Sequence, residues 1–227
     1  SEKTGISAFF VMEQIILTPD QKQLLHAFSL HPELQKQFYL SGGTALSAYY
    51  LKHRKSDDLD FFTHKTVDLA TVTEFTKHIK EKLGAKHVSY ERLYDRNIFI
   101  FSTNPTLKVE FTRYPFPHLE PLVEKNGVLI DSLYDIAVNK LFALFDRNEP
   151  KDFVDLYFLL KRFILKKLVT GVTKKFDMTI SALTLGSELL KVRHITMMPR
   201  MILPLIREDL VAFFEKHASA LKKDILL

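Results

Sequence analysis

The pattern of hydrophobic and polar positions changes character along the chain. Residues 68–83 carry apolar side chains at helical spacing, whereas residues 106–114 alternate apolar and polar positions as a half-buried strand does. From residue 131 onward the helical spacing dominates. The pattern therefore predicts a mixed α/β part followed by a helical part.

Individual elements follow from the same periods together with glycine, proline and capping residues. Helices are predicted at residues 18–29, 44–53, 68–83, 132–146, 150–163 and 207–223, with a further helical segment within 174–192. Strands are predicted at residues 38–40, 58–62, 87–93, 97–102, 106–114 and 128–130. We expect an α+β fold, with a core of a small mixed sheet flanked by helices over residues 1–130 and a helical C-terminal region, residues 131–227, packed against that core.

A glycine turn and two aspartates carry the most chemical information. Gly42, Gly43 and Thr44 lie between a predicted strand and a predicted helix, and Asp58 and Asp60 lie two residues apart on the next strand. Side chains at that spacing project from the same face of a strand, where like charges repel unless a cation lies between them. Mg²⁺ prefers such oxygen ligands and is often shared with substrate phosphates, which backbone amides after a glycine turn can approach. The sequence predicts a nucleotide and metal site.

The alternating strand at residues 106–114 offers a third carboxylate, Glu110, on the face opposite its apolar residues. Three carboxylates on adjacent strands could hold two Mg²⁺ ions about 3.5–4 Å apart, an arrangement used in phosphoryl and nucleotidyl transfer. The alternative is that Glu110 is one of the ordinary polar residues on the outer face of an alternating strand. An isolated Asp-x-Asp could equally lie on a solvent-exposed strand edge.

The composition excludes several other kinds of chemistry. The 227-residue chain has no cysteine, which rules out disulfides, thiolate zinc sites and cysteine nucleophiles and fits a reducing cytoplasm. No run approaches the roughly 18 apolar residues of a membrane span, and the N-terminal residues do not have the pattern of a secretory signal. We expect a cytoplasmic protein with no membrane partner.

The net charge of +5 is unevenly distributed. Residues 1–155 contain 19 Lys or Arg and 21 Asp or Glu, a balance of −2, while residues 156–227 contain 13 and 6, a balance of +7. A basic C-terminal part could hold a polyanionic substrate such as nucleic acid. The alternative is a solvated basic face.

Lys140 stands in the apolar stripe of the predicted helix 132–146, where a charge is costly unless it has a partner. A triphosphate or Asp152 on the next helix could provide one, or the amine could reach water. Arg147 lies on roughly the same face and could contact phosphate or cap the helix. Lys151 and Asp152 open the following helix, and of its two acids Asp152 is a better candidate than Asp155.

Two blocks of sequence resemble a known family. Residues 39–62, with Gly-Gly-Thr-Ala-Leu followed by His-Arg-x-Ser-x-Asp-Leu-Asp-Phe-Phe, resemble the first motif of the AbiEii/AbiGii toxin family. Residues 135–157, with a Lys…Arg…Lys-Asp-x-x-Asp pattern, resemble its later motifs. These toxins are bacterial nucleotidyltransferases of the polymerase-beta-like superfamily, so the resemblance implies a core of that fold.

The resemblance also implies a role for each matching residue. Asp58 and Asp60 correspond to metal ligands, and Glu110 falls at the position of a third catalytic carboxylate. Residues implied in nucleotide binding are Gly42, Gly43, Thr44, Lys140, Arg147, Lys151 and Asp152.

The function implied is Mg²⁺-dependent transfer of NMP from an NTP to an acceptor hydroxyl. The family suggests a type IV toxin–antitoxin or phage-defence role, with a tRNA 3′ end as a plausible acceptor and a cognate antitoxin as partner. One alternative keeps the chemistry but modifies a hydroxyl on a protein or a small molecule. The other is a non-catalytic module that binds nucleotide or RNA on the same scaffold.

Overall fold

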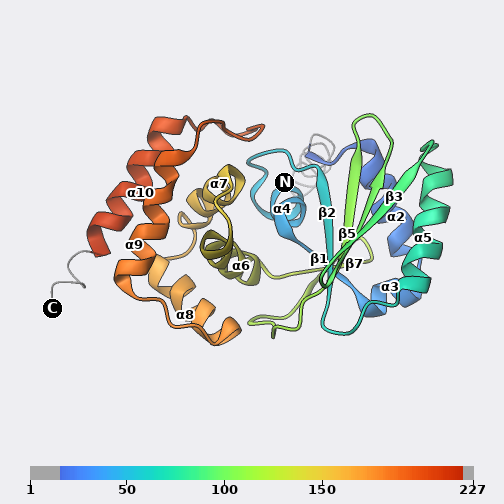
Figure 1. Cartoon of the computed structure of the whole chain (residues 1–227), viewed down its shortest axis with the longest axis horizontal. Coiled ribbons are helices and arrows are strands. Elements are labelled where there is room, and N and C mark those ends of the chain that lie inside the picture. The colour runs from blue at the N-terminus through green and yellow to red at the C-terminus, as the bar shows by residue number, and fades with distance from the viewer. Residues whose placement is uncertain (1–15, 222–227) are drawn as a thin grey trace, which may run out of the picture. The chain divides into compact units, whose positions relative to one another are not determined.

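The computed structural model describes residues 16–221, which divide into two compact units (Figure 1). Of the described residues, the first unit takes in 16–116 and 121–132, and the second takes in 117–120 and 133–221. Each unit has its own hydrophobic core and is described separately below.

The first unit is built on a mixed sheet that has seven strands within the described residues. The order across the sheet is β3-β4-β5-β2-β1-β7-β6. The pairs β2–β5 and β1–β7 are parallel, and the remaining neighbours are antiparallel. The strands are β1 (Tyr39–Ser41), β2 (Asp58–Thr63), β3 (Val88–Leu93), β4 (Arg96–Phe101), β5 (Leu107–Arg113), β6 (Val123–Lys125) and β7 (Val128–Ile130).

Helices cover one face of this sheet. In Figure 1, α2 (Pro19–Ser29), α3 (Pro32–Gln37) and α5 (Leu69–Lys82) lie on one side of the strands, and the short α4 (Gly42–Ala45) lies on the other. Helix α2 begins with a capping box, in which Thr18 and Gln21 each accept a backbone N–H of the other. The mixed sheet with flanking helices confirms the predicted α+β class.

The two central strands separate apolar and acidic side chains onto opposite faces. Along β2, Leu59 and Phe61 are buried, while Asp58 and Asp60, which alternate with them, are partly exposed. The ring of Phe61 stacks on Phe111 of β5 at a centroid distance of 5.1 Å. The core therefore lies on the helix-covered face, and the carboxylates face the other way.

The predicted helix at residues 44–53 is wrong in its geometry. After one turn of α4, the chain continues as a π-helix, η1 (Leu46–Leu51), in which the N–H of Lys52 donates to the carbonyl of Ser47 at 3.0 Å. Lys52 then adopts a left-handed conformation, with φ of 54°, that ends the segment. A stretch of six residues is too short for the spacing of apolar positions to distinguish a π-helix from an α-helix.

The second unit is helical throughout the part that the structure describes. Its elements are α6 (Leu133–Asp146), α7 (Pro150–Leu159), α8 (Leu165–Phe176), α9 (Ala182–Leu190), the 3₁₀ segment η2 (Lys191–His194) and α10 (Arg207–Leu221). The predicted helix 132–146 is confirmed. The predicted helix 207–223 is confirmed up to Leu221, and its last two residues lie outside the described range. Helix α7 ends at Leu159, before the predicted end at residue 163.

The elements absent from the predicted set include α3, β6 and α8. Helix α8 contains Gly171 and four β-branched residues, which all disfavour a helix. Burial of its apolar stripe, which includes Leu168 and Val172, outweighs that propensity. None of the helices within residues 16–221 combines the length and the apolarity that crossing a membrane would require.

Gly171 lets α8 approach α6 closely. A Cβ at Gly171 would lie 2.7 Å from the hydroxyl oxygen of Tyr134 and would also collide with Val138. We expect Gly171→Ala to lower the free energy of unfolding by about 1–3 kcal/mol, because the two helices would have to separate. Gly186→Ala in α9 is the matched control, since the atom nearest to its added Cβ lies 4.0 Å away. That change should stabilise by about 0.5–1 kcal/mol through helix propensity. Urea unfolding of both variants measures the difference, and equal stabilities would contradict the packing argument.

Candidate functional site

Two adjacent parallel strands, β2 and β5, bring the predicted carboxylates onto one face of the first unit. Asp60 on β2 is paired with Ser41 of β1 on one side and with Glu110 of β5 on the other. Asp58 lies two residues before Asp60 and is paired with Lys108. Because side chains directly opposite each other share a face of the sheet, Asp58, Asp60 and Glu110 form one acidic cluster.

The glycine turn lies directly against this acidic cluster. Gly42 has a φ of 72°, and a Cβ at this position would collide with the carboxylate of Asp60. A Cβ at Gly43 would lie 2.6 Å from the guanidinium of Arg54. Both glycines are therefore needed for the close approach of the turn to charged side chains, and both remain partly exposed.

Thr44 has a structural role in this turn. Its side chain is fully buried, and its hydroxyl donates a hydrogen bond to the backbone carbonyl of Asp58. This bond fixes the turn to the first residue of β2. The family resemblance implies that Thr44 contacts nucleotide phosphates, and in the structure its hydroxyl is engaged by the backbone of β2.

The loop that leads into β2 is anchored from α2. The side-chain amide of Gln21 donates to the backbone carbonyls of Ser56 at 2.9 Å and Asp57 at 3.1 Å. Arg54 in the same loop is buried and donates to the carbonyl of Lys55 at 2.9 Å. The start of β2, and with it Asp58, is thus held by Gln21 of α2 and by the hydroxyl of Thr44.

Glu110 is buried and engaged by two cations. The Arg96 guanidinium donates through Nε and Nη2 to its two carboxylate oxygens at 2.8 and 2.7 Å, and the Lys108 ammonium lies 2.5 Å from Oε1. Burial raises the pKa of the Glu110 carboxyl, but Arg96 and Lys108 outweigh burial, and its pKa lies below the ordinary value. The two cations keep this carboxylate ionised.

Lys108 also faces the aspartates. Its ammonium lies 3.8 Å from a carboxylate oxygen of Asp58, and the charge of Asp60 acts on it as well. Burial lowers the pKa of Lys108, but Glu110 and Asp58 outweigh burial and leave the pKa above its ordinary value. Neither Lys108 nor Arg96 is among the site residues predicted from the sequence. The available signal for Lys108 was its spacing two residues before Glu110 on an alternating strand.

A second group of predicted residues forms a charged cluster in the second unit. The Lys140 ammonium lies 2.8 Å from Asp152 and 2.7 Å from Asp155, and both acids are fully buried. Arg147 donates to the two oxygens of Asp152 at 2.7 and 3.2 Å. Asp152 is thus a partner of Lys140, as the sequence suggested, and Asp155 is equally close. Lys151 pairs with Glu149 at 2.9 Å.

The predicted site residues therefore fall into two groups. The first unit contains Gly42, Gly43, Thr44, Asp58, Asp60 and Glu110, and the second contains Lys140, Arg147, Lys151 and Asp152. In the first unit these residues lie around the acidic cluster, and in the second unit most of them surround the buried carboxylates of Asp152 and Asp155. Lys151 is the exception, because its amine is directed to Glu149 and not to Asp152.

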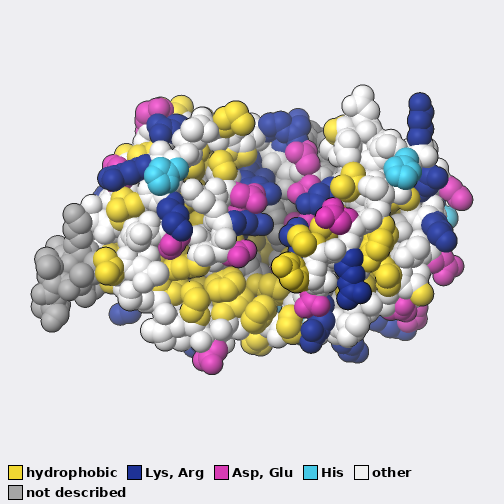
Figure 2. Space-filling model, in the orientation of Figure 1, with side chains coloured by type: hydrophobic (Ala, Val, Ile, Leu, Met, Phe, Trp, Pro, Cys, Tyr) yellow, Lys and Arg dark blue, Asp and Glu magenta, His cyan; other side chains and the backbone are white. Residues whose placement is uncertain are grey.

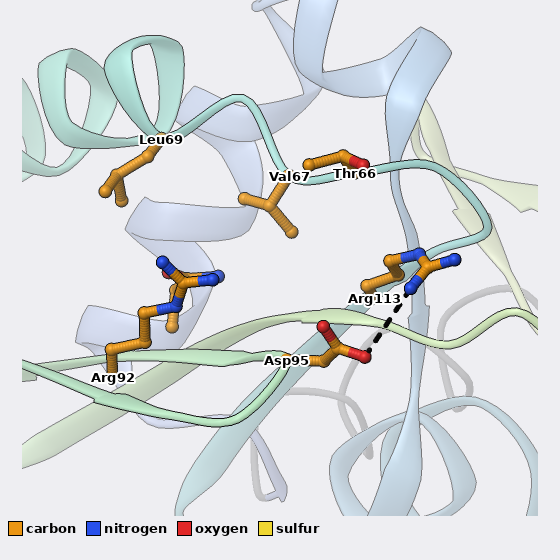
Figure 3. Close-up of a pocket in the computed structure, with 7 residues that line it drawn as sticks. Thr66, Val67, Leu69, Arg92, Asp95 and Arg113 are labelled. Carbon is orange, nitrogen blue, oxygen red and sulfur yellow. Dashed lines mark ion pairs between the residues drawn. The ribbon is translucent and has the colours of Figure 1, made fainter.

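A small pocket in the first unit is separate from the acidic cluster. It has a volume of about 130 Å³ and is lined by Thr66, Val67, Leu69, Arg92, Asp95, Asn97 and Arg113. Figure 3 shows Arg113 directed toward Asp95, and these two side chains form an ion pair of 3.7 Å. None of the predicted site residues lines this pocket, and we assign it no role.

Asp152 should make the second unit sensitive to acid. Burial raises its pKa, but Lys140 and Arg147 outweigh burial and hold the pKa below the ordinary value near 3.9. Its charge therefore stabilises the fold above about pH 4, and this stabilisation is lost as the pH falls through the lowered pKa. We expect Asp152→Asn to cost about 1–3 kcal/mol at pH 7, because the buried Lys140 loses a charged partner.

Urea unfolding at pH 7 and near pH 3 tests this expectation. The difference in the free energy of unfolding between wild type and Asp152→Asn should be smaller at the lower pH. The exposed Asp146 at the end of α6 supplies the control, Asp146→Asn, which should change stability by less than about 0.5 kcal/mol. A gap that persists unchanged at pH 3 would show that the charge of Asp152 is not the cause.

Comparisons with known proteins bear on the family and the fold of this chain. A protein of Aquifex aeolicus, aq_aa25, whose role is uncharacterised, is 37% identical over 145 residues, which are 61% of this chain and 66% of the relative. This match thus spans just under two thirds of the relative's length. The crystal structure of JHP933 from Helicobacter pylori superposes with a TM-score of 0.56 at 22% identity, covering 90% of each chain. A second H. pylori structure, assigned provisionally as a nucleotidyltransferase, superposes with a TM-score of 0.57 at 22% identity. The superposition covers 90% of this chain and 92% of that one.

At these identities the two crystal structures show a shared fold. The family assignment comes from a sequence model described as the nucleotidyl transferase AbiEii toxin of type IV toxin–antitoxin systems, which matches residues 23–223. This match extends well beyond the two blocks at residues 39–157 that carry the resemblance in the sequence. The chain belongs to the AbiEii family of nucleotidyl transferase toxins.

Proposed function

We propose that this protein is a Mg²⁺-dependent nucleotidyltransferase that moves NMP from an NTP to an acceptor hydroxyl. The acceptor oxygen forms a bond to the α-phosphorus and its hydroxyl gives up a proton. The bond from that phosphorus to the β-phosphate oxygen breaks, and pyrophosphate leaves. The proposal combines family membership with the arrangement of carboxylates in the first unit.

One observation carries the proposal, which is the register that aligns Ser41, Asp60 and Glu110 across three adjacent strands. This register places the glycine turn and three carboxylates on one polar face, with the turn against Asp60. Arg96 and Lys108 offset part of the negative charge, but a protein that needed only a stable sheet would gain little from three carboxylates on one face, since like charges at this spacing repel. The arrangement is suited to a ligand that carries both phosphates and a divalent cation.

The donor atoms fit a hard divalent cation. Asp58 and Asp60 offer carboxylate oxygens, the ligands that Mg²⁺ prefers, and the Asp58 side chain is about one third exposed and so is open to solvent. Asp58 and Asp60 would hold the metal, with Glu110 as the third acid of the cluster and a two-metal arrangement as the expected form. When bound, Mg²⁺ would neutralise charge on the triphosphate and promote loss of the acceptor's proton.

The chain's own residues would bind the nucleotide. Gly42 and Gly43 are partly exposed in a turn with unusual backbone geometry, so their backbone N–H groups are candidates for phosphate contacts. Thr44 would hold this turn in place. In the second unit, Lys140, Arg147 and Lys151 are proposed as cations for the nucleotide, and Asp152 would position Lys140 and Arg147.

We further propose RNA as the acceptor class, with a tRNA 3′ end as the candidate, in a type IV toxin–antitoxin or phage-defence system with a cognate antitoxin. The excess of seven positive charges in residues 156–227 supports a polyanionic acceptor. Figure 2 shows basic side chains interspersed with acidic and apolar ones on the visible face of the second unit.

Loss of either aspartate should abolish transfer. We expect Asp58→Ala and Asp60→Ala each to reduce Mg²⁺-dependent pyrophosphate release from NTP by about 100-fold or more, because developing charge would lose its stabilisation. Glu91→Gln on the exposed edge strand β3 is the control and should retain wild-type activity. Equal activity of wild type and both aspartate variants, with folding verified by circular dichroism, would overturn the assigned mechanism.

The acceptor is identified by labelling. Each α-labelled NTP is incubated in turn with the protein, Mg²⁺, and either total tRNA, a protein lysate freed of nucleic acid, or a small-molecule extract. We expect label in the tRNA fraction and none with Asp58→Ala. Label in one of the other fractions would replace the RNA acceptor by a protein or small-molecule hydroxyl. NTP binding without turnover in any fraction would instead support a non-catalytic module.

A further inference from the structure

Lys108 occupies an unusual position for a lysine beside a proposed cation site. Its ammonium lies between two of the acids, 2.5 Å from Glu110 and 3.8 Å from Asp58. It reaches this position because β2 and β5 are parallel and in register, with Lys108 directly opposite Asp58. The side chain is about one third exposed, so it can move away into solvent.

Glu110 is the residue that holds Lys108 in place. Its side chain is only 6% exposed, and a buried carboxylate needs cationic partners to remain ionised. Arg96 provides one partner through a bidentate contact, and Lys108 provides the other. Because both oxygens of Glu110 are already engaged, this carboxylate acts first on the two cations beside it.

We propose that Lys108 is a built-in counter-ion of the acidic cluster, which competes with a divalent cation for Asp58 and thereby sets the metal affinity of the site. Glu110 is its positioning residue. This inference rests on the proposed function, because it takes Asp58 and Asp60 to be the metal ligands. Lys108 was not predicted from the sequence to belong to the site. Its proposed role also explains why Glu110 is paired with cations.

Electrostatic repulsion between the Lys108 ammonium and an incoming cation underlies this competition. An ammonium near Asp58 lowers the local negative potential that attracts a second cation, and two unit charges about 4 Å apart interact appreciably at the effective dielectric constant of a protein surface. Without metal, the ammonium offsets part of the negative charge at Asp58 and weakens the attraction of that carboxylate for a free ion. A metal that arrives with the charges of an NTP would be disfavoured less, because the phosphates can take up the displaced ammonium. The site would then favour metal–nucleotide over metal alone.

Mn²⁺ binding in the absence of nucleotide tests this proposal, with the free ion quantified by electron paramagnetic resonance on the full chain. We expect Lys108→Met to bind Mn²⁺ about tenfold more tightly than wild type at low salt, since it removes the competing charge and keeps the aliphatic stem. This gain should shrink as the salt concentration rises to about 1 M, where such interactions are screened. Lys108→Arg retains the charge and should restore an affinity within about threefold of wild type.

Lys77→Met is the matched control. Lys77 is exposed on α5, which covers the opposite face of the sheet, and the substitution removes the same unit of net charge. Its Mn²⁺ affinity should equal that of wild type. A Lys108→Met protein that folds normally by circular dichroism and binds Mn²⁺ no more tightly than wild type overturns the inference, as does an equal gain in Lys77→Met.

Asp58→Ala separates this inference from the proposed function. If Asp58→Ala binds Mn²⁺ as wild type does, the proposed metal site itself is wrong, and the role of Lys108 falls with it. If Asp58→Ala loses binding while Lys108→Met leaves the affinity unchanged, the metal site stands and only the role of Lys108 is refuted. Absence of Mn²⁺ binding in both wild type and Lys108→Met also overturns the inference.

Discussion

The stacking of Phe61 on Phe111 is the contact on which the first unit depends. Phe28 of α2 stacks in turn on Phe61 at 4.3 Å, so that helix, β2 and β5 meet in one apolar layer. Side chains alternate between faces with a period of two, and burial of these rings leaves no freedom in the register. A slip of one residue would bury Asp60 and expose Phe61. The geometry of the acidic cluster is thus a consequence of the hydrophobic core behind it.

The two units use buried charge in different ways. In the acidic cluster of the first unit, the carboxylates of Asp58 and Asp60 remain accessible on the polar face, and Glu110 is the deeply enclosed member. In the second, Lys140 lies among fully buried acids, an arrangement that is costly to assemble and more costly to break. Such a cluster fixes the relation of α6 to α7, since its members come from both helices. Rigidity of this kind is useful where a lysine must be presented in one orientation.

The sequence predicted the site best where the two-residue period of a strand decides which side chains share a face of the sheet. Asp58, Asp60 and Glu110 could be placed on one face because β2 and β5 have clear periods. The cost of burying an unpaired charge pointed to a partner for Lys140 and left Asp152 as one of three candidates, with a triphosphate and water. The ion pairs of Arg96 with Glu110 could not be foreseen, because the pairing of β4 with β5 sets them and no local pattern reports it. The π-helix after Thr44 and the helical state of α8 were missed for a related reason. In both, contacts made after folding override the local preference of the chain.

The position of the acidic cluster within the sheet has a consequence for its motions. Strands β2 and β5 each have a hydrogen-bonded neighbour on both sides, and the hairpins β3–β4 and β6–β7 lie at the two ends of the sheet. Amide protons of such interior strands exchange with solvent chiefly through global unfolding, whereas edge strands open locally. The backbone that carries these carboxylates is therefore expected to open only when the first unit unfolds as a whole. A ligand that binds them would raise the stability of that whole unit by mass action and would leave the flanking hairpins free to fluctuate.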